Sequence, residues 1–130
     1  MTVLHFRKAQ ARGGAEERRS RLRRGRIAEA LAAAALMAKG YLILGRRVKT
    51  RAGEIDIIAV RGKRLAFVEV KRRATAESAE ASIGSRQATR IRHAADHWLA
   101  HRPRYHGHEQ GFDLILLVPG RWPRHIPNGL

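Results

Sequence analysis

The 130-residue chain contains no cysteine. This absence excludes disulfide bonds and any zinc site built on thiolates, because both need the cysteine sulfur. A reducing compartment is compatible with this composition, and we expect a cytoplasmic protein. Long apolar runs are missing as well, since the longest uncharged one, Ala30 to Ala38, is far shorter than the roughly 20 residues of a membrane span. The first residues lack the hydrophobic core of a secretion signal, so we expect neither feature.

Acidic residues are scarce. The chain has 11 Asp and Glu against 27 Lys and Arg, which gives a net charge of +16 at pH 7. Such an excess predicts a polyanionic partner, either nucleic acid or an anionic membrane surface. Much of it is concentrated between residues 7 and 26, around the Gly13-Gly14 pair. We predict a flexible basic arm over residues 1–22 and a single domain over residues 23–130. The alternative is a highly charged, solvated surface from a GC-rich genome.

The remaining sequence has enough apolar content, 44%, to bury the core of one domain. Hydrophobic periodicity predicts two helices and four strands in the order α-β-β-β-α-β, which indicates an α/β fold with a mixed sheet flanked by helices. We expect the proline-containing tail to be extended, with Trp122 pinned to the domain. The predicted helices cover about 26–39 and 84–101, and the predicted strands are Tyr41 to Arg47, Ile55 to Val60, Leu65 to Val70 and Phe112 to Val118.

Four charged residues lie at the ends of the two strands that form a predicted hairpin. The turn between these strands, residues 61–64, contains Gly62-Lys63. A symmetric turn places Asp56 opposite Glu69 and Glu54 opposite Lys71, and the alternation of side chains brings all four to one side. Directly opposed carboxylates repel each other, so we predict a divalent cation between them. The alternative is that charged residues simply mark strands that leave the core.

Glu29 is the one charged residue between Ile27 and Ala38. On a helix it shares an angular sector with Ala33 and Leu36, so its carboxylate faces apolar neighbours. A carboxylate in such surroundings usually finds a cation, a metal or a proton. The alternative is that Glu29, one turn into the helix, merely interacts favourably with the helix dipole.

With these segments, the chain resembles the YraN family of small bacterial proteins, which have a restriction-endonuclease-like fold. The similarity extends from about Gly25 to near the C-terminus. The motifs that carry it are the Ala-rich helix ending in Lys39-Gly40-Tyr41, Gly53-Glu54-Ile55-Asp56, Phe67-Val68-Glu69-Val70-Lys71, Trp98-Leu99, Phe112-Asp113 and a closing Trp122 segment.

The resemblance implies a site of the PD-(D/E)XK nuclease superfamily, which includes Holliday-junction resolvases. It implies that Glu29, Asp56 and Glu69, with the Val70 carbonyl, hold Mg²⁺ or Mn²⁺, and that Lys71 is the catalytic lysine. Two departures affect the expected substrate contacts. Residues 74–81 lack the aromatic-Gly pair expected after the lysine, and Gln87 stands where many members carry Lys.

Basic residues flank the acidic segments on both sides, which suits a phosphodiester that must approach carboxylates. Gln87, on the second helix, either hydrogen-bonds toward the metal site or is a border residue. Histidines at four-residue spacing on that helix, His93, His97 and His101, could bind zinc, but they lack an acidic partner, and we favour a phosphate-facing or solvated stripe. The predicted nucleic-acid-binding residues are Arg46, Arg47, Lys49, Arg51, Arg72, Arg73 and Gln87.

These observations predict a metal-dependent nuclease that hydrolyses phosphodiester bonds in DNA, of resolvase or repair type. Two alternatives remain open. One is a non-catalytic nucleic-acid-binding protein that retains the nuclease fold. The other is an interaction protein with a ribosomal or membrane partner, in which the acidic residues form salt bridges with Lys71. The sequence does not fix the oligomeric state, and a dimer is compatible with it.

Overall fold

The computed structural model describes residues 2–83 and 88–130, with the side chains of the first helix described from residue 13 onward. Its five strands form one sheet in the order β1-β2-β3-β4-β5, in which only β3 and β4 run parallel. This α/β arrangement with a mixed sheet confirms the predicted fold class. The elements are α1 (Thr2–Ala38), β1 (Leu42–Thr50), β2 (Gly53–Arg61), β3 (Arg64–Arg72), α2 (Ala76–Ala81), α3 (Ala88–Ala100), the 3₁₀ turn η1 (Pro103–Tyr105), β4 (Glu109–Leu117) and β5 (Arg124–Ile126).

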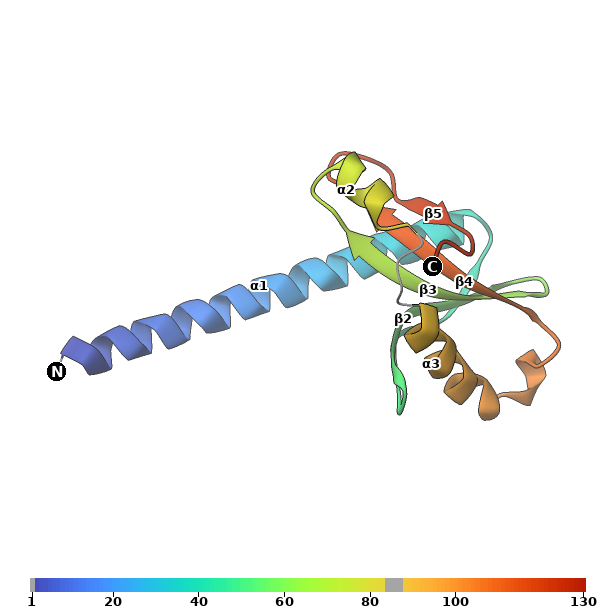
Figure 1. Ribbon diagram of the computed structural model, residues 1–130, viewed down its shortest axis with the longest axis horizontal. Helices are drawn as coiled ribbons and strands as arrows, with labels where there is room; N and C mark the ends of the chain where they lie inside the picture. Colours follow the sequence, from blue (N-terminus) through green and yellow to red (C-terminus); the bar gives the residue numbers. More distant parts are fainter. Residues whose placement is uncertain (1, 84–87) are drawn as a thin grey trace.

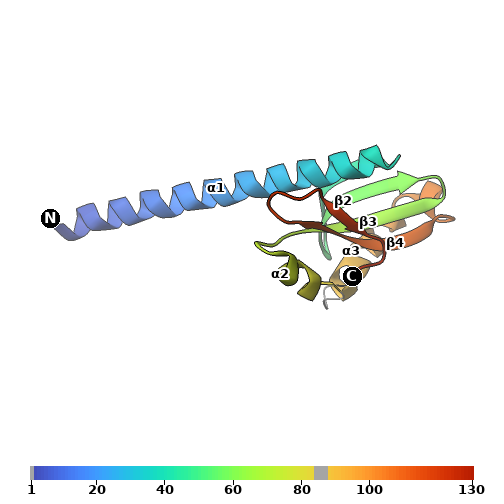
Figure 2. The ribbon, with the colours of Figure 1, turned by 90° about the horizontal axis from the view of Figure 1, so that it is seen from above.

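Helices cover both faces of the sheet (Figure 1 and Figure 2). The C-terminal part of α1 packs Ala32, Ala33 and Leu36 against one face. Helix α3 packs Ile91, Trp98 and other apolar residues against the opposite face, on a cluster centred on Phe67. The central strands are therefore buried on both sides, which explains their nearly continuous apolar sequence.

Helix α1 is longer than the sequence pattern predicts, because it begins at Thr2 and not near residue 26. Its first half projects away from the sheet (Figure 1). The segment is rich in Ala, Arg, Leu and Glu, which are strong helix formers, and it contains no proline. The basic segment 1–22, which we expected to lack regular structure, is thus helical from Thr2, whereas its separation from the domain as an arm stays a prediction.

The C-terminus of α1 is closed by Gly40, as the sequence predicts. Gly40 has a φ of 91°, and its N–H donates to the Met37 carbonyl. The Tyr41 N–H donates to the Leu36 carbonyl at 3.0 Å. This pair of hydrogen bonds satisfies carbonyls that the helix leaves unpaired, and glycine tolerates the left-handed backbone that the motif requires. The chain then turns directly into β1.

Two short elements were not predicted individually, and the position of one side chain was predicted wrongly. Helix α2 lies in a segment for which no element was predicted, and the Thr75 hydroxyl caps it by accepting from the Ser78 N–H. Part of the tail forms β5 along β4. Trp122 is 75% exposed and therefore not pinned to the domain. None of the helices in the described part of the chain is both long and apolar enough to cross a membrane.

A buried carboxylate fastens the C-terminal segment to the sheet. Asp113 on β4 is fully buried and accepts two hydrogen bonds from the Arg64 guanidinium, at 2.6 and 2.7 Å. The His125 ring on β5 lies 2.7 Å from the same carboxylate, and the Asn128 N–H donates to it at 2.9 Å. These interactions hold the pKa of Asp113 well below its usual range despite the burial, which opposes them. One carboxylate therefore joins β3, β4 and the tail.

Candidate active site

Asp56 lies where the pairing of β2 with β3 ends. The ladder has the register that a symmetric turn predicts, and its last pair is Ile57 with Val68. One residue further along β2, the Asp56 carboxylate accepts a hydrogen bond of 2.8 Å from the backbone N–H of Val70. From here β3 continues beside β4 as far as Arg72. The carboxylate is thus fixed at the point where the two strands separate.

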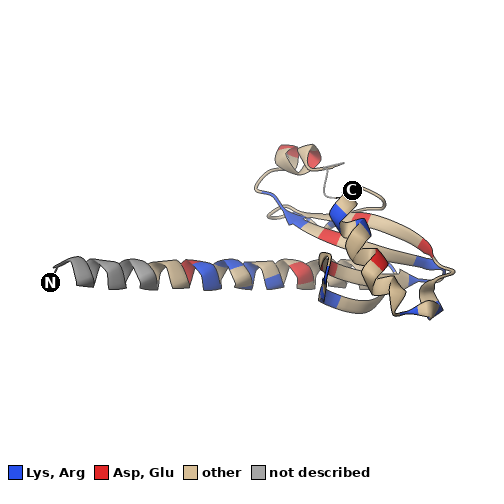
Figure 3. Ribbon diagram, turned by 60° about the horizontal axis from the view of Figure 1, so that its bottom comes forward, with Lys and Arg blue, Asp and Glu red and all other residues tan. Residues whose placement is uncertain are grey.

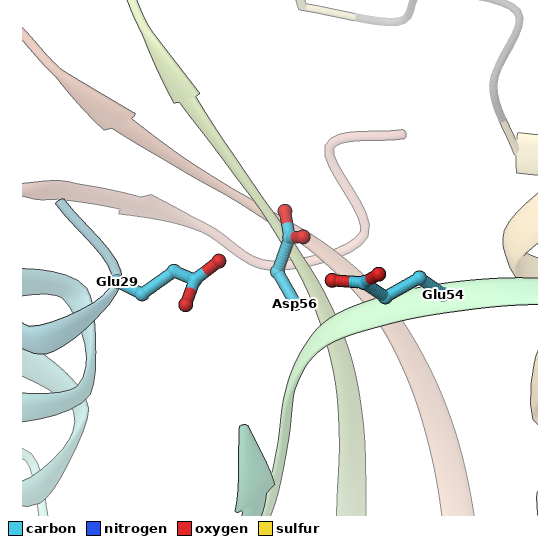
Figure 4. Close-up of side chains that lie close together, drawn as sticks. All are labelled: Glu29, Glu54 and Asp56. Atoms are coloured by element: carbon cyan, nitrogen blue, oxygen red, sulfur yellow. The ribbon is translucent and has the colours of Figure 1, made fainter. Parts of the chain in front are cut away.

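Three carboxylates converge at this point. Glu29 comes from α1, and Glu54 and Asp56 come from β2 (Figure 4). One oxygen of each lies within 4.8 Å of the others. The Glu29 side chain is only 12% exposed, in agreement with its predicted position toward apolar neighbours. We call Glu29, Glu54 and Asp56 the acidic triad.

The surroundings disfavour a negative charge on Asp56. They raise its pKa from 3.8 to about 6, and the largest cause is burial of the carboxyl group. The nearby carboxylates of Glu29, Glu69 and Glu54 raise this pKa further, whereas the Val70 N–H lowers it. A cation at the triad would reverse this effect, because it favours the ionised carboxylate.

The donor set fits a hard divalent cation. Carboxylate oxygens are the ligands that Mg²⁺, Mn²⁺ and Ca²⁺ prefer. A cavity of about 10 Å³ lies at the site, lined by Glu54, Asp56, Glu69, Arg90 and Ile91. This is close to the smallest volume that accommodates one water molecule. The converging carboxylates therefore form a candidate site for a divalent cation.

Glu69 and Lys71 lie beside the triad without belonging to it. The Glu69 carboxylate lines the cavity, but the described group of converging oxygens includes Glu54 in its place. A Glu69 oxygen lies 3.5 Å from the Arg90 guanidinium. Lys71 is 8% exposed, and the alternation of side chains along β3 places it on the same side as Glu69. Val70 presents its N–H to Asp56, and the role of its carbonyl stays a prediction.

Comparison with known proteins assigns the chain to a family. Residues 28–117 match the model of the uncharacterised protein family UPF0102. The chain belongs to the UPF0102 family. This is the YraN family that the sequence motifs resemble. The matched segment contains the whole triad, Glu69 and Lys71, so the candidate site lies within the family domain.

Several UPF0102 relatives match over most of their length. The chain is 54% identical over 108 residues to the UPF0102 protein of Maricaulis maris, covering 83% of this chain and 85% of the relative. It is 49% identical over 111 residues to the UPF0102 protein of Mesorhizobium japonicum, with coverage of 85% and 89%. A third, from Caulobacter vibrioides, is 52% identical over 104 residues, with coverage of 80% and 83%. These similarities support one shared fold.

Two arginines of this UPF0102 chain lie against the acidic residues. The Nε of Arg47 on β1 is 2.5 Å from a Glu29 carboxylate oxygen. The sequence predicts Arg47 as a phosphate contact, and it gives no signal that places Arg90 beside Glu69. Arg47 has a left-handed backbone, with a φ of 48°, which no local motif of the sequence indicates. Its pairing with Glu29 therefore had no signal at the sequence level.

The other predicted phosphate contacts occupy two places on the surface. Lys49 and Arg51 share a shallow pocket of about 160 Å³ with His97 and His101, so part of the histidine stripe faces basic residues. Arg46 and Arg72 are exposed, while Arg73 donates to the Ser82 hydroxyl at 2.8 Å. Gln87 lies outside the described residues. Figure 3 shows Lys and Arg along the described part of α1 as well as on the domain.

Proposed function

We propose that this protein is a metal-dependent nuclease that hydrolyses phosphodiester bonds in DNA, of resolvase or repair type. The observation that carries the proposal is the convergence of Glu29, Glu54 and Asp56 at the point where β2 and β3 separate. A buried Lys71 follows on the neighbouring strand. The net charge of +16 supports a polyanionic substrate.

In the proposed site, the triad and Glu69 would hold Mg²⁺ or Mn²⁺, and the Val70 carbonyl is a further candidate ligand. When bound, the ion polarises the phosphate and lowers the pKa of a bound water. Asp56 is held in place by the Val70 N–H, which fixes the orientation of its carboxylate before any ligand binds. Lys71 orients the attacking water and stabilises the charge that develops on the phosphate.

Arg47 has a second role in this proposal. Its guanidinium partly neutralises Glu29 in the structure. The guanidinium would compete with a divalent cation at the triad for the Glu29 carboxylate, and the two positive charges would repel each other. Arg47 then becomes available to a phosphate, which reconciles its contact with Glu29 with the nucleic-acid role that the sequence predicts.

The second candidate function is nucleic-acid binding without catalysis. Two observations favour it. Glu29 is paired with Arg47, and Glu69 lies near Arg90, so arginine side chains offset part of the negative charge without a metal. In this case the acidic residues act as an ion-pair cluster that keeps the fold, and the basic surface supplies the affinity.

A cleavage assay separates the two functions. Linear, nicked, single-stranded and four-way-junction DNA, with RNA for comparison, are incubated with the protein in Mg²⁺, in Mn²⁺ or in EDTA. The nuclease proposal expects metal-dependent products with the wild type and none with Asp56→Asn, which preserves size and an acceptor for the Val70 N–H. If wild type cuts no substrate in either metal while binding persists, the non-catalytic function is favoured.

A further inference from the structure

A groove outside the acidic triad separates α1 from the loop between β4 and β5. Its volume is about 700 Å³. Figure 2 shows this loop running beside the C-terminal half of α1. The apolar residues that line the groove include Ile27, Leu31 and Leu117, and Trp122 lines it as well. Ile27 and Leu31 are 54% and 52% exposed, so this part of the apolar lining is accessible to a ligand.

The charged side chains around this groove have one sign. Four arginines line it, and none of its described lining residues is acidic. A neighbouring hollow on the other side of Trp122 differs, because it is lined by Glu80, which pairs with Arg124. The arginines of the groove between α1 and the loop are Arg24, Arg72, Arg73 and Arg121.

Trp122 is largely exposed to solvent, so its indole ring is accessible to a ligand. It is 75% exposed, whereas Trp98, the other tryptophan of the chain, is 6% exposed and packs in the core. A largely exposed indole between arginines offers a flat π surface next to cationic groups. Proteins bind unpaired nucleic acid with this combination, in which a base stacks on an aromatic ring and arginines contact the phosphates.

We propose that this groove binds an unpaired strand of nucleic acid, with one base stacked on Trp122 and the adjacent phosphates on Arg24, Arg72 and Arg121. Charge complementarity selects this occupant. A second copy of the chain would bring two molecules of charge +16 together. A duplex keeps the faces of its bases stacked inside, so a base that stacks on Trp122 must come from an unpaired region or an end.

The groove shares α1 with the acidic triad and adjoins the end of β3, the strand that carries Lys71. Ile27 and Ala28 line it, and Glu29 is the next residue of α1. Arg72 and Arg73 line it as well, and they directly follow Lys71 in the sequence, Arg72 as the last residue of β3. This inference deepens the proposed function and rests on it in one respect: the strand in the groove belongs to the DNA that the triad cleaves. The proposed substrate class is therefore DNA with an unpaired segment next to a duplex.

The binding test uses the full chain in EDTA, so that neither a metal nor cleavage is involved. Fluorescence anisotropy with labelled 12-residue oligo(dT) and with a 12-base-pair duplex gives the two affinities. Trp122→Ala should weaken binding of the single strand roughly tenfold or more, and binding of the duplex only slightly. Trp122→Phe should restore most of the affinity because it keeps an aromatic face. Leu42→Ala is the matched control, since Leu42 is a 65% exposed apolar residue outside the groove lining.

Quenching of intrinsic fluorescence provides a second measurement. Oligo(dT) should quench the tryptophan emission of wild type, and Trp122→Phe should remove this quenching while Trp98 remains as the internal signal. Equal loss of single-strand and duplex affinity in Trp122→Ala, or no loss, would overturn the proposal. Trp122-dependent binding to phosphatidylglycerol vesicles with unchanged oligo(dT) affinity would instead make a membrane surface the occupant of the groove. A dimer in sedimentation that Trp122→Ala dissociates would make a second copy of the chain the occupant.

The outcomes for the groove and for the triad are separable. Because affinity is measured in EDTA, it does not depend on whether the triad holds a cation. If the groove does not bind the single strand, metal-dependent cleavage by wild type remains, and only the expected preference for unpaired DNA is lost. If wild type cleaves no DNA, Trp122-dependent binding of oligo(dT) should still be observed, but the groove then has no role in catalysis.

Discussion

Arg47 reaches Glu29 from a left-handed backbone conformation, with its Nε 2.5 Å from the carboxylate and a φ of 48°. In the β1 and β2 ladder, Arg46 pairs with Ile57 and Val48 with Ile55, so Arg47 is opposite Asp56. A non-glycine residue in this conformation costs roughly 1–2 kcal/mol and persists only where its surroundings compensate. The interaction with Glu29 is the compensating contact that the structure provides.

We therefore expect Arg47→Ala to weaken the metal-free fold and to strengthen cation binding. Loss of the ion pair should lower the free energy of unfolding by about 1 kcal/mol in EDTA. Removal of a competing positive charge should tighten Mn²⁺ binding roughly tenfold, as measured by calorimetric titration. Arg46→Ala, at an exposed neighbouring position, is the control. Weaker Mn²⁺ binding in Arg47→Ala would show that Arg47 does not compete with the ion.

Arg47→Gly separates backbone strain from the ion pair. Both substitutions remove the guanidinium, but glycine adopts a positive φ without steric cost. The glycine variant should therefore be about 1 kcal/mol more stable than the alanine variant, although glycine elsewhere in a strand is the weaker choice. Urea denaturation of the two variants in EDTA measures this difference, and the opposite order would exclude strain at this position.

The raised pKa of Asp56 predicts a pH dependence of stability. Between its unfolded value of 3.8 and about 6, the folded state binds more protons at this group than the unfolded state. Its contribution therefore falls as the pH rises through this window, and Asp56→Asn should stabilise the metal-free protein by about 1–2 kcal/mol at pH 7.5. The gain should disappear near pH 4. Unfolding in EDTA at both pH values measures it, with Asp96→Asn on the exposed side of α3 as the control.

The same carboxylate should make cation binding depend on pH. A metal ligand must be deprotonated, so Mn²⁺ affinity of the wild type should rise between pH 5 and 7. Asp56→Asn should bind Mn²⁺ far more weakly at every pH. Opposite effects of one substitution on stability and on binding identify a functional carboxylate. A variant that loses stability in EDTA would instead assign Asp56 a structural role through Val70.

Asp113 should stabilise the fold, in contrast to Asp56, so its substitution should lower the free energy of unfolding. Asp113→Ala leaves the Arg64 guanidinium without its partner and should cost about 3–5 kcal/mol of unfolding free energy. Adding Arg64→Met to this variant should recover part of the loss, because it removes the unpaired charge. Chemical denaturation of the two single variants and the double variant measures the coupling. An additive double variant would contradict a direct interaction between the two residues.

Local sequence patterns were sufficient to predict the hairpin that carries Asp56. The turn at residues 61–64 is symmetric, and the observed register follows from it. The Gly40 stop also acts locally and was predicted correctly. The pairing of Asp113 with Arg64 was not predicted, because the two residues are 49 positions apart and meet only when β3 and β4 align in parallel.

The composition of the acidic triad also depends on contacts that local sequence patterns do not predict. Opposed positions in a hairpin indicate Glu69 as the partner of Asp56. The structure places Glu54 in the triad because the ladder ends at Ile57 and because α1 brings Glu29 to that side. Both causes arise from the tertiary structure and not from the local sequence. Trp122 is a comparable case, since an aromatic residue in a tail suggests docking, and its exposure depends on how the loop runs past α1.

Deletion of residues 1–22 tests the basic segment that precedes the family domain. The segment is part of α1 but projects from the sheet, so the domain should remain folded without it (Figure 1). Affinity for duplex DNA should fall for all sequences, and the slope of log affinity against log salt should decrease by about 0.9 for each phosphate that the shortened protein no longer neutralises. Binding measured between low and moderate salt gives the slope. An unchanged slope would show that this segment does not contact DNA.

Lys71 separates catalysis from binding. It is buried beside the carboxylates, so its proposed role is in the chemical step, and it contributes at most one of many positive charges to DNA attraction. Lys71→Met keeps the length of the side chain and should abolish metal-dependent cleavage while lowering affinity by about one phosphate contact. Lys71→Arg should not restore cleavage, because the larger planar guanidinium does not reproduce the position of the ammonium group at this buried site. Single-turnover cleavage and equilibrium binding are compared on a substrate that the wild type cuts, with Lys63→Met in the exposed turn as the control. Normal cleavage by Lys71→Met would refute the assigned role of the lysine even in an active nuclease, because the acidic residues would then suffice for the chemical step.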